Sequence, residues 1–314
     1  MKIITITLNP AFDLHYTMKN FSLYQENYVE SILVAAGGKG INISRALSKN
    51  GIDNLAYVMV GEENGSEFIR QLTEDGLCFK EFYCKSRIRE NITIHTSEPM
   101  ETRISLDSFS VSFDLLQQLL DDLRYEIDDQ TIISFSGRIP KGLAVSDVIQ
   151  FLMELKQTGC LLAVDSNSFT MEDLLSIKPW LIKPNEQEIQ VLFGKHIQTV
   201  EDARVAATKI RDMGIENVII SMGEAGAGAA TKYSDYVIKV PSISPVSTIG
   251  AGDSTVAGFI GAYAQGYDIE ACLKTAVSFG TAACLTEGTD PPRPEDVQRI
   301  RQEVWISNVP VTIV

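Results

Sequence analysis

Residues 248–254 read Thr248-Ile249-Gly250-Ala251-Gly252-Asp253-Ser254 and come directly before a helical pattern of apolar residues. Small residues at the start of a helix let successive backbone N–H groups converge, and this arrangement binds anions. Asp253 falls in the first helical turn, where a carboxylate beside a bound anion is well placed to act as a general base. A glycine-rich turn with an aspartate as N-cap accounts for the same letters without any ligand.

A second junction of this kind reads Ala36-Gly37-Gly38-Lys39-Gly40-Ile41-Asn42 and lies between a strand pattern and a helix pattern. Its glycines allow a ligand to approach the backbone, Lys39 is suited to a phosphate, and Asn42 to a sugar hydroxyl. The alternative is a tight turn with a solvated lysine. The segment is not a P-loop, because the pattern GxxxxGK[ST] occurs nowhere in the chain.

Two further segments follow predicted strands. The first, Lys183-Pro184-Asn185-Glu186-Gln187-Glu188, places Asn185 and Glu188 on one face of a helix, where two oxygen ligands suit Mg²⁺ directly or through waters. A helix N-cap with a capping-box glutamate fits the same residues. The second, Ser221-Met222-Gly223-Glu224-Ala225-Gly226-Ala227-Gly228, carries glycines that let a nucleotide lie against the backbone, or that only connect two strands.

Short apolar runs alternate with helical patterns along the chain. The predicted strands cover 3–8, 55–60, 131–135, 160–164, 180–182 and 217–221, and the predicted helices cover 41–50, 66–74, 145–157, 200–213, 253–265, 269–286 and 294–304. This alternation predicts an α/β fold with a mainly parallel sheet, helices on both faces, and ligands at the carboxyl ends of the strands. The first strand ends in Asn9-Pro10 rather than in glycines, which argues against a dinucleotide-binding oxidoreductase.

Residues 13–34 and 89–106 break this alternation. They contain strand patterns without helices between them, and polar residues such as Thr93, His95 and Ser97 stand at alternate positions. That pattern suits a small sheet with one face in water. We therefore expect a single domain over residues 1–314, with these two segments forming a β-sheet lid. The tail over 305–314 also alternates apolar and polar residues, and it predicts either an edge strand or an oligomer contact.

Composition excludes several classes of protein. The chain has 27 Lys and Arg residues against 41 Asp and Glu residues, a formal charge of −14, and no basic run, so we expect no nucleic-acid partner. No apolar run reaches the roughly 18 residues of a membrane span, and the N-terminus lacks the pattern of a signal peptide. Five cysteines without a CxxC pair predict free buried thiols in a reducing cytoplasm, and three scattered histidines offer no metal cluster.

The four segments, in this order and spacing, resemble the PfkB carbohydrate kinases, the ribokinase-like family, over nearly the whole chain. Residues 37–42 with Gly51 and Gly61 are similar to the N-terminal signature of that family, and residues 248–253 to its C-terminal signature. Within the family, Thr7-Leu8-Asn9-Pro10-Ala11-Phe12-Asp13, the lysine of Gly-Gly-Lys-Gly and Ser136-Gly137-Arg138-Ile139-Pro140 resemble 1-phosphofructokinases and tagatose-6-phosphate kinases. The resemblance implies in-line transfer of a phosphoryl group from ATP to a hydroxyl of a hexose phosphate. Fructose 1-phosphate, converted to fructose 1,6-bisphosphate, is the first candidate, and tagatose 6-phosphate or another sugar the alternative.

The resemblance also implies roles for single residues. It makes Asp253 the base, assisted by the backbone N–H groups of Gly250, Ala251 and Gly252, and it forms the acceptor site from Asp13, Gly38, Lys39, Asn42, Arg89, Asn91 and Arg138. It assigns ATP binding to Lys183, Asn185, Ser221, Gly223, Gly226 and Gly252, and Mg²⁺ binding, through waters, to Asn185 and Glu188. Relatives carry a small residue in place of Arg138, and residues 25–27 lack the basic lid residue of some relatives. A homodimer formed through the lid is the expected assembly, and a non-catalytic sugar-phosphate-binding regulator is the alternative outside the enzymes.

Overall fold

The large sheet forms the centre of the molecule. The structure, a computed structural model, describes residues 1–97, 101–194 and 196–310. In this part of the chain ten strands lie in the order β14 (Trp305–Pro310), β13 (Ser234–Lys239), β12 (Ala227–Ala230), β11 (Asn217–Ser221), β10 (Leu181–Ile182), β9 (Leu161–Asp165), β8 (Thr131–Ser136), β1 (Lys2–Thr7), β4 (Leu55–Gly61) and β5 (Phe79–Cys84). The strands from β11 to β5 are parallel, and β12, β13 and β14 extend the sheet in antiparallel pairs.

Helices cover both faces of this sheet, because side chains alternate between its two faces. In β1, Ile3 packs into one hydrophobic cluster and Ile4 and Ile6 into the other. The first cluster contains side chains of α1 (Lys39–Lys49), α8 (Ala251–Ala264), α9 (Ile269–Ala283) and α10 (Pro294–Glu303). The second contains side chains of α2 (Gly65–Glu74), α3 (Phe113–Glu126), α4 (Val145–Lys156), α5 (Met171–Ile177), α6 (Glu186–Phe193) and α7 (Val200–Asp212).

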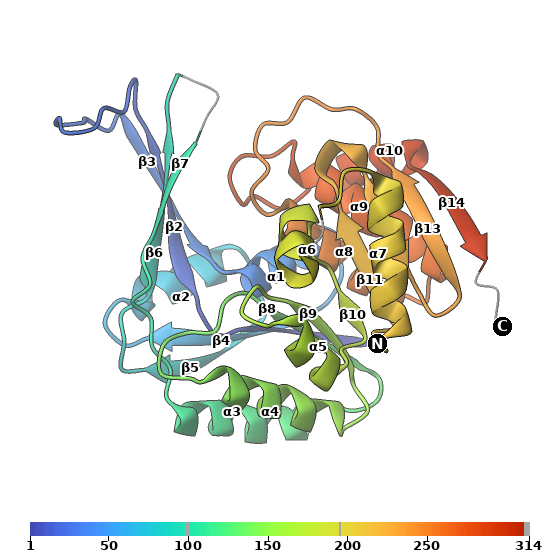
Figure 1. The fold of residues 1–314 in the computed structure, drawn as a ribbon. Helices are drawn as coiled ribbons and strands as arrows, with labels where there is room; N and C mark the ends of the chain where they lie inside the picture. Colours follow the sequence, from blue (N-terminus) through green and yellow to red (C-terminus); the bar gives the residue numbers. More distant parts are fainter. Residues whose placement is uncertain (98–100, 195, 311–314) are drawn as a thin grey trace.

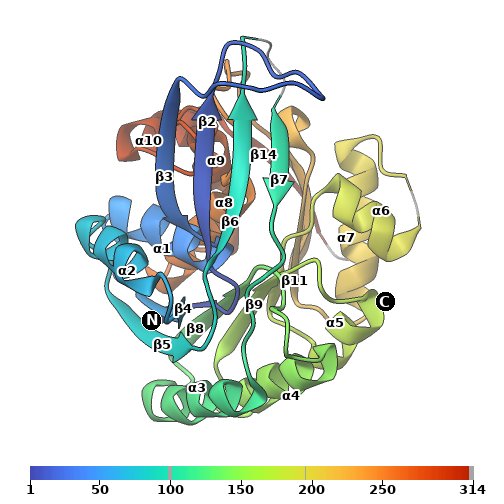
Figure 2. The same cartoon turned by 90° about the vertical axis from the view of Figure 1, so that its left-hand side faces the viewer.

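A second sheet of four strands projects from the main body (Figure 1). Its order is β3 (Ser31–Gly37), β2 (Ala11–Thr17), β6 (Arg89–His95) and β7 (Thr102–Ser105), and Figure 2 shows these strands side by side. β2 pairs with β3 in antiparallel and with β6 in parallel register, and β6 pairs with β7 in antiparallel register. This sheet lies where the sequence predicts the lid, and β3 ends at Gly37, beyond the predicted lid segment of residues 13–34.

The predicted architecture is confirmed, with a mainly parallel sheet covered on both faces and a separate small sheet. The described part of the tail, Trp305–Pro310, forms an edge strand, since β14 pairs with β13 in antiparallel register, and residues 311–314 lie outside the described residues. The sequence patterns did not predict α3, α5, β5 or the β12–β13 hairpin. β12 was missed because Ala227-Gly228-Ala229-Ala230 lacks the branched residues that mark strands. A Cβ atom on Gly228 would lie 2.2 Å from the backbone nitrogen of Arg204, so the packing of α7 requires glycine there.

The cysteines agree only in part with the expectation of free buried thiols. All five are free, but Cys78 is exposed, whereas Cys84, which stands in a more polar stretch, is buried. Cys84 is the last residue of β5, and its thiol donates to the carbonyl oxygen of Val60 on the neighbouring strand at 3.4 Å. Within the described ranges, no helix is both long and apolar enough to cross a membrane.

Candidate active site

Asp253 is buried at the first turn of α8. The helix begins after Gly250, whose backbone is left-handed with φ 76°, and no side chain caps it. The carboxylate of Asp253, whose residue is 6% exposed, accepts a hydrogen bond of 2.8 Å from Nδ2 of Asn42 on α1. The interpretation of Asp253 as an N-cap is therefore wrong. The helix start leaves backbone N–H groups of residues 250–253 available to a ligand, with a buried carboxylate beside them.

Two lysines and an aspartate surround this carboxylate. Nζ of Lys39 lies 3.0 Å from Oδ2 of Asp165, and Nζ of Lys183 lies 3.9 Å from Oδ1 of the same residue. Asp165 and Lys183 are each only 4% exposed. A Cβ atom on Gly252 would stand 3.1 Å from Nζ of Lys183, which places this ammonium group directly against the glycine turn. Two cations thus lie beside the start of α8, where an anionic phosphate would be stabilised.

The sequence analysis missed Asp165. It is the last residue of β9, directly after an apolar strand, and its side chain joins Lys39 from α1 to Lys183 from the loop after β10. A charged residue at the carboxyl end of a predicted parallel strand was the available signal, since ligands gather at that edge.

Burial and neighbouring charges shift the pKa values of the residues in this cluster. Burial raises the pKa of Asp253 to about 6, against the lowering effect of the Lys39 ammonium. Burial disfavours the charged form of Lys39, but Asp165 and Asp253 hold its pKa above the ordinary value. Burial opposes ionisation of Asp165 as well, yet Lys183 and Lys39 keep its pKa below the usual value. Lys39 and Asp165 therefore stay charged near neutral pH, while Asp253 is the member able to gain and lose a proton there.

A chain of polar side chains runs from the base of the lid. Arg89 donates from Nε to Oδ1 of Asn9 at 2.8 Å and from Nη1 to Oδ1 of Asn91 at 2.7 Å. Asn91 in turn donates from Nδ2 to Oδ1 of Asp13 at 2.9 Å. A Cβ atom on Gly37 would lie 2.0 Å from Oδ2 of Asp13, so only glycine leaves this carboxylate its place. Two lid strands, β2 and β6, together with Asn9 between β1 and β2, hold Asp13, Arg89 and Asn91 in one network.

Several groups near this network have no protein partner. Arg138 follows β8 and is exposed. Burial lowers the pKa of the Arg89 guanidinium, and the nearby positive charge of Arg138 also lowers it. Among the described residues, Arg138 forms no ion pair, and two buried side-chain oxygens, Oγ1 of Thr7 and Oδ1 of Asn42, lack any hydrogen bond. Gly38, with φ 131°, passes close to Thr7. Asn42 thus donates to Asp253 while its oxygen stays open to a hydroxyl donor.

The predicted nucleotide residues stand farther along the same edge of the sheet. Ser221 ends β11, and its backbone nitrogen donates to the carbonyl oxygen of Pro184 at 3.1 Å. Gly223 lies exposed in the short 3₁₀ turn η1 (Gly223–Ala225). Gly226 is buried, and a Cβ atom there would lie 2.0 Å from the carbonyl oxygen of Ile238, so the approach of β13 requires this glycine. Gly226 has a packing role, and a nucleotide role for it stays a prediction.

Asn185 and Glu188 form the capping box at the start of α6. Oδ1 of Asn185 accepts from the backbone nitrogen of Glu188 at 2.8 Å, and Oε2 of Glu188 accepts from the backbone nitrogen of Asn185 at 2.9 Å. Glu188 also lies near enough to Lys39 to raise the pKa of that ammonium. The capping interpretation is therefore correct, and within the described ranges it leaves Oε1 of Glu188 without a protein hydrogen bond.

These donors fit Mg²⁺ in its usual protein setting. Glu188 and Asn185 offer the hard oxygen ligands that Mg²⁺ prefers, but no group of three or more His, Cys, Asp or Glu residues able to hold a metal occurs within the described part of the chain. Mg²⁺ commonly binds through one or two carboxylates together with waters and substrate phosphates, and this donor set suits that mode.

The fold and this site together define a ribokinase-like α/β protein with a buried carboxylate and two lysines beside a glycine-rich helix start. The chain belongs to the family described as pfkB family carbohydrate kinase, whose sequence profile matches residues 7–296. It is therefore a phosphotransferase, as the resemblance implies.

Named relatives support the family. A 1-phosphofructokinase from Haemophilus influenzae is 31% identical over 267 residues, which cover 84% of this chain and 85% of the relative. A tagatose-6-phosphate kinase from Staphylococcus epidermidis is 29% identical over 310 residues, covering 98% of this chain and all of the relative. The crystal structure of phosphofructokinase-2 from Escherichia coli in complex with potassium superposes with a TM-score of 0.89 at 25% identity, over 96% of this chain and 98% of that one.

Proposed function

We propose that this chain transfers a phosphoryl group from ATP to a hydroxyl of a hexose phosphate, with fructose 1-phosphate as the acceptor and fructose 1,6-bisphosphate as the product. The observation that carries the proposal is the position of Asp253. Its carboxylate is buried, bonded to Asn42, raised in pKa to about 6, and set beside the anion-binding start of α8. A base with that pKa is deprotonated at neutral pH and still able to accept a proton.

In the proposed reaction, Asp253 takes the proton of the acceptor hydroxyl as that oxygen attacks the terminal phosphorus of ATP and the bond to the ADP oxygen breaks. The N–H groups of Gly250 to Asp253, with Lys39 and Lys183, stabilise the charge that spreads over the transferring phosphoryl group. Glu188 and Asn185 would hold Mg²⁺ through waters, and the ion would supply positive charge to the phosphates of ATP. Asn42 keeps the base oriented through its 2.8 Å hydrogen bond.

A phosphorylated acceptor is supported by the cations at the base of the lid. Arg89 commits Nε and Nη1 to Asn9 and Asn91, which fixes its guanidinium and leaves Nη2 for a ligand. Arg138 stands nearby as a second cation. In a chain of formal charge −14, a dianionic sugar phosphate needs such local cations to bind. The named relatives act on fructose 1-phosphate or tagatose 6-phosphate, so the second of these sugars is the alternative acceptor.

The acceptor can be identified by coupled ADP release. Purified protein is offered fructose 1-phosphate, fructose 6-phosphate, tagatose 6-phosphate and unphosphorylated fructose, each with ATP and Mg²⁺, and kcat/KM is compared. We expect fructose 1-phosphate to give the largest value. A larger value for plain fructose would refute the phosphosugar acceptor. Binding of phosphosugars without ADP release from any of them would support the non-catalytic regulator instead.

The proposed assembly is a homodimer formed through the lid. Ile32, Leu33 and Val34 on β3 are all exposed, which leaves an apolar edge on this small sheet. A structural neighbour, the inhibited form of phosphofructokinase-2 from Escherichia coli, is tetrameric. Light scattering of wild type and of Leu33→Asp tests the proposal, because a lid dimer should dissociate in the variant.

A cytoplasmic location remains a prediction that rests on the free thiols.

A further inference from the structure

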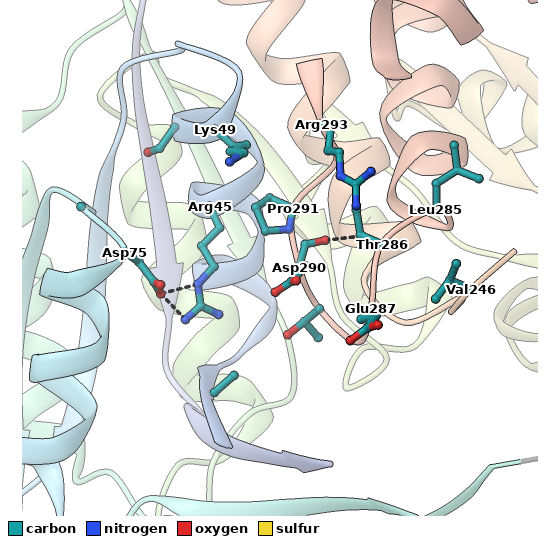
Figure 3. A pocket seen from close by; sticks show the side chains of 14 residues that line it. Arg45, Lys49, Asp75, Val246, Leu285, Thr286, Glu287, Asp290, Pro291 and Arg293 are labelled. Carbon is teal, nitrogen blue, oxygen red and sulfur yellow. Dashed lines mark hydrogen bonds and ion pairs between the residues drawn. The ribbon is translucent and has the colours of Figure 1, made fainter. Parts of the chain in front are cut away.

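A cavity of about 830 Å³ lies beside the proposed acceptor site and has no role in the proposed reaction. It is bounded by α1, the end of α2, Ala35 of β3 and residues 285–293 between α9 and α10 (Figure 3). Its volume is within the range of about 300–1,000 Å³ that small-molecule sites occupy. The predicted nucleotide residues on β11 and α6 do not line it.

Arg45 is the buried cation of this cavity. The residue is 9% exposed, and its Nε and Nη2 both donate to the same oxygen, Oδ2 of Asp75, at 2.7 and 2.5 Å. In Figure 3 the guanidinium reaches toward Asp75, with Asp290 on the facing wall. Nη1 has no partner among the residues that the structure describes. A guanidinium group carries five donor hydrogens, so Nη1 remains able to donate to an occupant of the cavity.

Four more ionised side chains line the same cavity without pairing with one another. Lys49 stands one turn beyond Arg45 on α1, and Arg293 faces in from the start of α10. Glu287 and Asp290 come from the segment after α9. Over the described ranges, none of these four forms an ion pair within 4.0 Å, whereas Arg45 and Asp75 in the same wall do.

The mixture of charges indicates the chemistry of an occupant. The lining is balanced in formal charge, because Arg45, Lys49 and Arg293 stand with three carboxylates, those of Asp75, Glu287 and Asp290. Arg45 is paired with Asp75, which leaves Lys49, Arg293 and Nη1 of Arg45 for a phosphate, and charge-assisted contacts to phosphate are the stronger class of hydrogen bond. The two carboxylates without an ion pair, Glu287 and Asp290, disfavour a polyanion but accept hydrogen bonds from hydroxyl groups. A small molecule with one phosphate and several hydroxyls satisfies both sets, whereas a nucleoside triphosphate would bring its charge against Glu287 and Asp290.

An occupant would contact two elements that lead to the active site. Asn42, Arg45 and Lys49 are three and four residues apart and so lie along one side of α1, and Asn42 is the residue bonded to Asp253. Gly288, in the segment that carries Glu287 and Asp290, packs against the ring of His15 on lid strand β2, where an added Cβ atom would stand 3.0 Å away.

From these observations we infer that the cavity is a second binding site, separate from the acceptor site, for a small phosphorylated polyol. Arg45, Lys49 and Arg293 take the phosphate, and Glu287 and Asp290 take hydroxyl groups. The inference concerns binding and does not depend on the identity of the acceptor.

The test uses glycerol 3-phosphate as the probe and isothermal titration calorimetry as the readout. We expect binding to wild type at about millimolar concentration, weakened about tenfold or more in Lys49→Ala and in Arg293→Ala. Arg89→Ala, which alters the proposed acceptor site, should retain this binding. Lys209→Ala is the matched control, since Lys209 is an exposed lysine on α7 outside the cavity. Glycerol alone should not bind, and inorganic phosphate should bind more weakly than the probe.

Two results would overturn the inference. One is the absence of any binding heat when wild type is titrated with about ten millimolar glycerol 3-phosphate. The dissociation constant would then exceed about ten millimolar, which corresponds to a binding free energy weaker than about 3 kcal/mol. The other is binding that is lost in Arg89→Ala but unchanged in Lys49→Ala and Arg293→Ala, because the probe would then occupy the acceptor site. Circular dichroism on each variant excludes loss of fold as the cause. Failure of the proposed kinase reaction would leave these binding results unaffected.

Discussion

Replacing Asp253 by Asn should cost activity and increase stability at the same time. The carboxylate is buried, and its pKa is about 6 against an ordinary value of 3.8. Because the folded state raises this pKa, it binds the proton more tightly than the unfolded chain does. The contribution of the protonated carboxyl to the free energy of unfolding is complete below the pKa of the unfolded state and is lost as pH rises through the higher pKa of the folded state. Above that range the ionised carboxylate destabilises the fold.

The size of the effect follows from the shift. A change of about two pKa units corresponds to about 3 kcal/mol, at about 1.4 kcal/mol per unit. Asparagine carries no charge, and its oxygen can still accept from Asn42, so Asp253→Asn should recover part of this energy at about pH 8 and almost none at about pH 4. Turnover should fall by about 10²–10⁴-fold, the usual contribution of a positioned base.

Two measurements check this reasoning. Chemical denaturation of wild type and variant at the two pH values gives the difference in unfolding free energy. Steady-state rates give kcat/KM against pH, which in wild type should fall about tenfold per unit below the pKa of the base. Wild-type kcat in the variant would show that Asp253 is not the base. A variant less stable than wild type at alkaline pH would refute the argument from burial, because the aspartate would then be a structural group.

Glu188→Gln should raise the Mg²⁺ concentration needed for half-maximal rate. Thermal stability should stay nearly unchanged, because glutamine can still accept a hydrogen bond from the backbone nitrogen of Asn185. An unchanged Mg²⁺ titration would show that Glu188 acts only as a helix cap. Arg89→Ala should raise KM for the phosphosugar about tenfold to a hundredfold with little change in KM for ATP, as expected for one charge-assisted contact. Equal changes in the two KM values would refute the assignment of Arg89 to the acceptor site. Arg138→Ser should narrow the ratio of kcat/KM for fructose 1-phosphate over fructose, and an unchanged ratio would exclude Arg138 from acceptor binding. Lys39→Ala should raise the pKa of Asp253 further, since its ammonium lowers that pKa, and this would appear as a shift of the acid limb of the pH–rate profile to higher pH.

Short-range patterns predicted much of this protein. Apolar runs between helical patterns indicated the parallel strands, and β11 has the predicted bounds. Alternating polar residues indicated the lid, and glycines at two junctions indicated the starts of α1 and α8. These features are local, because a strand period, a helix period and a glycine turn are each visible within about ten residues. The pairing of signatures far apart in the sequence indicated the family.

Local patterns and paired signatures were thus enough to predict the class of fold, the family and most candidate residues. How those residues act depends on the folded chain. It brought Lys39, Asp165 and Lys183 from three separate segments into one charged cluster, and it excluded water from Asp253. It also showed that Gly226 serves the packing of β13. Burial and charge pairing depend on atoms distant in the chain, so pKa values and unpaired groups such as Nη1 of Arg45 cannot be inferred from a local pattern.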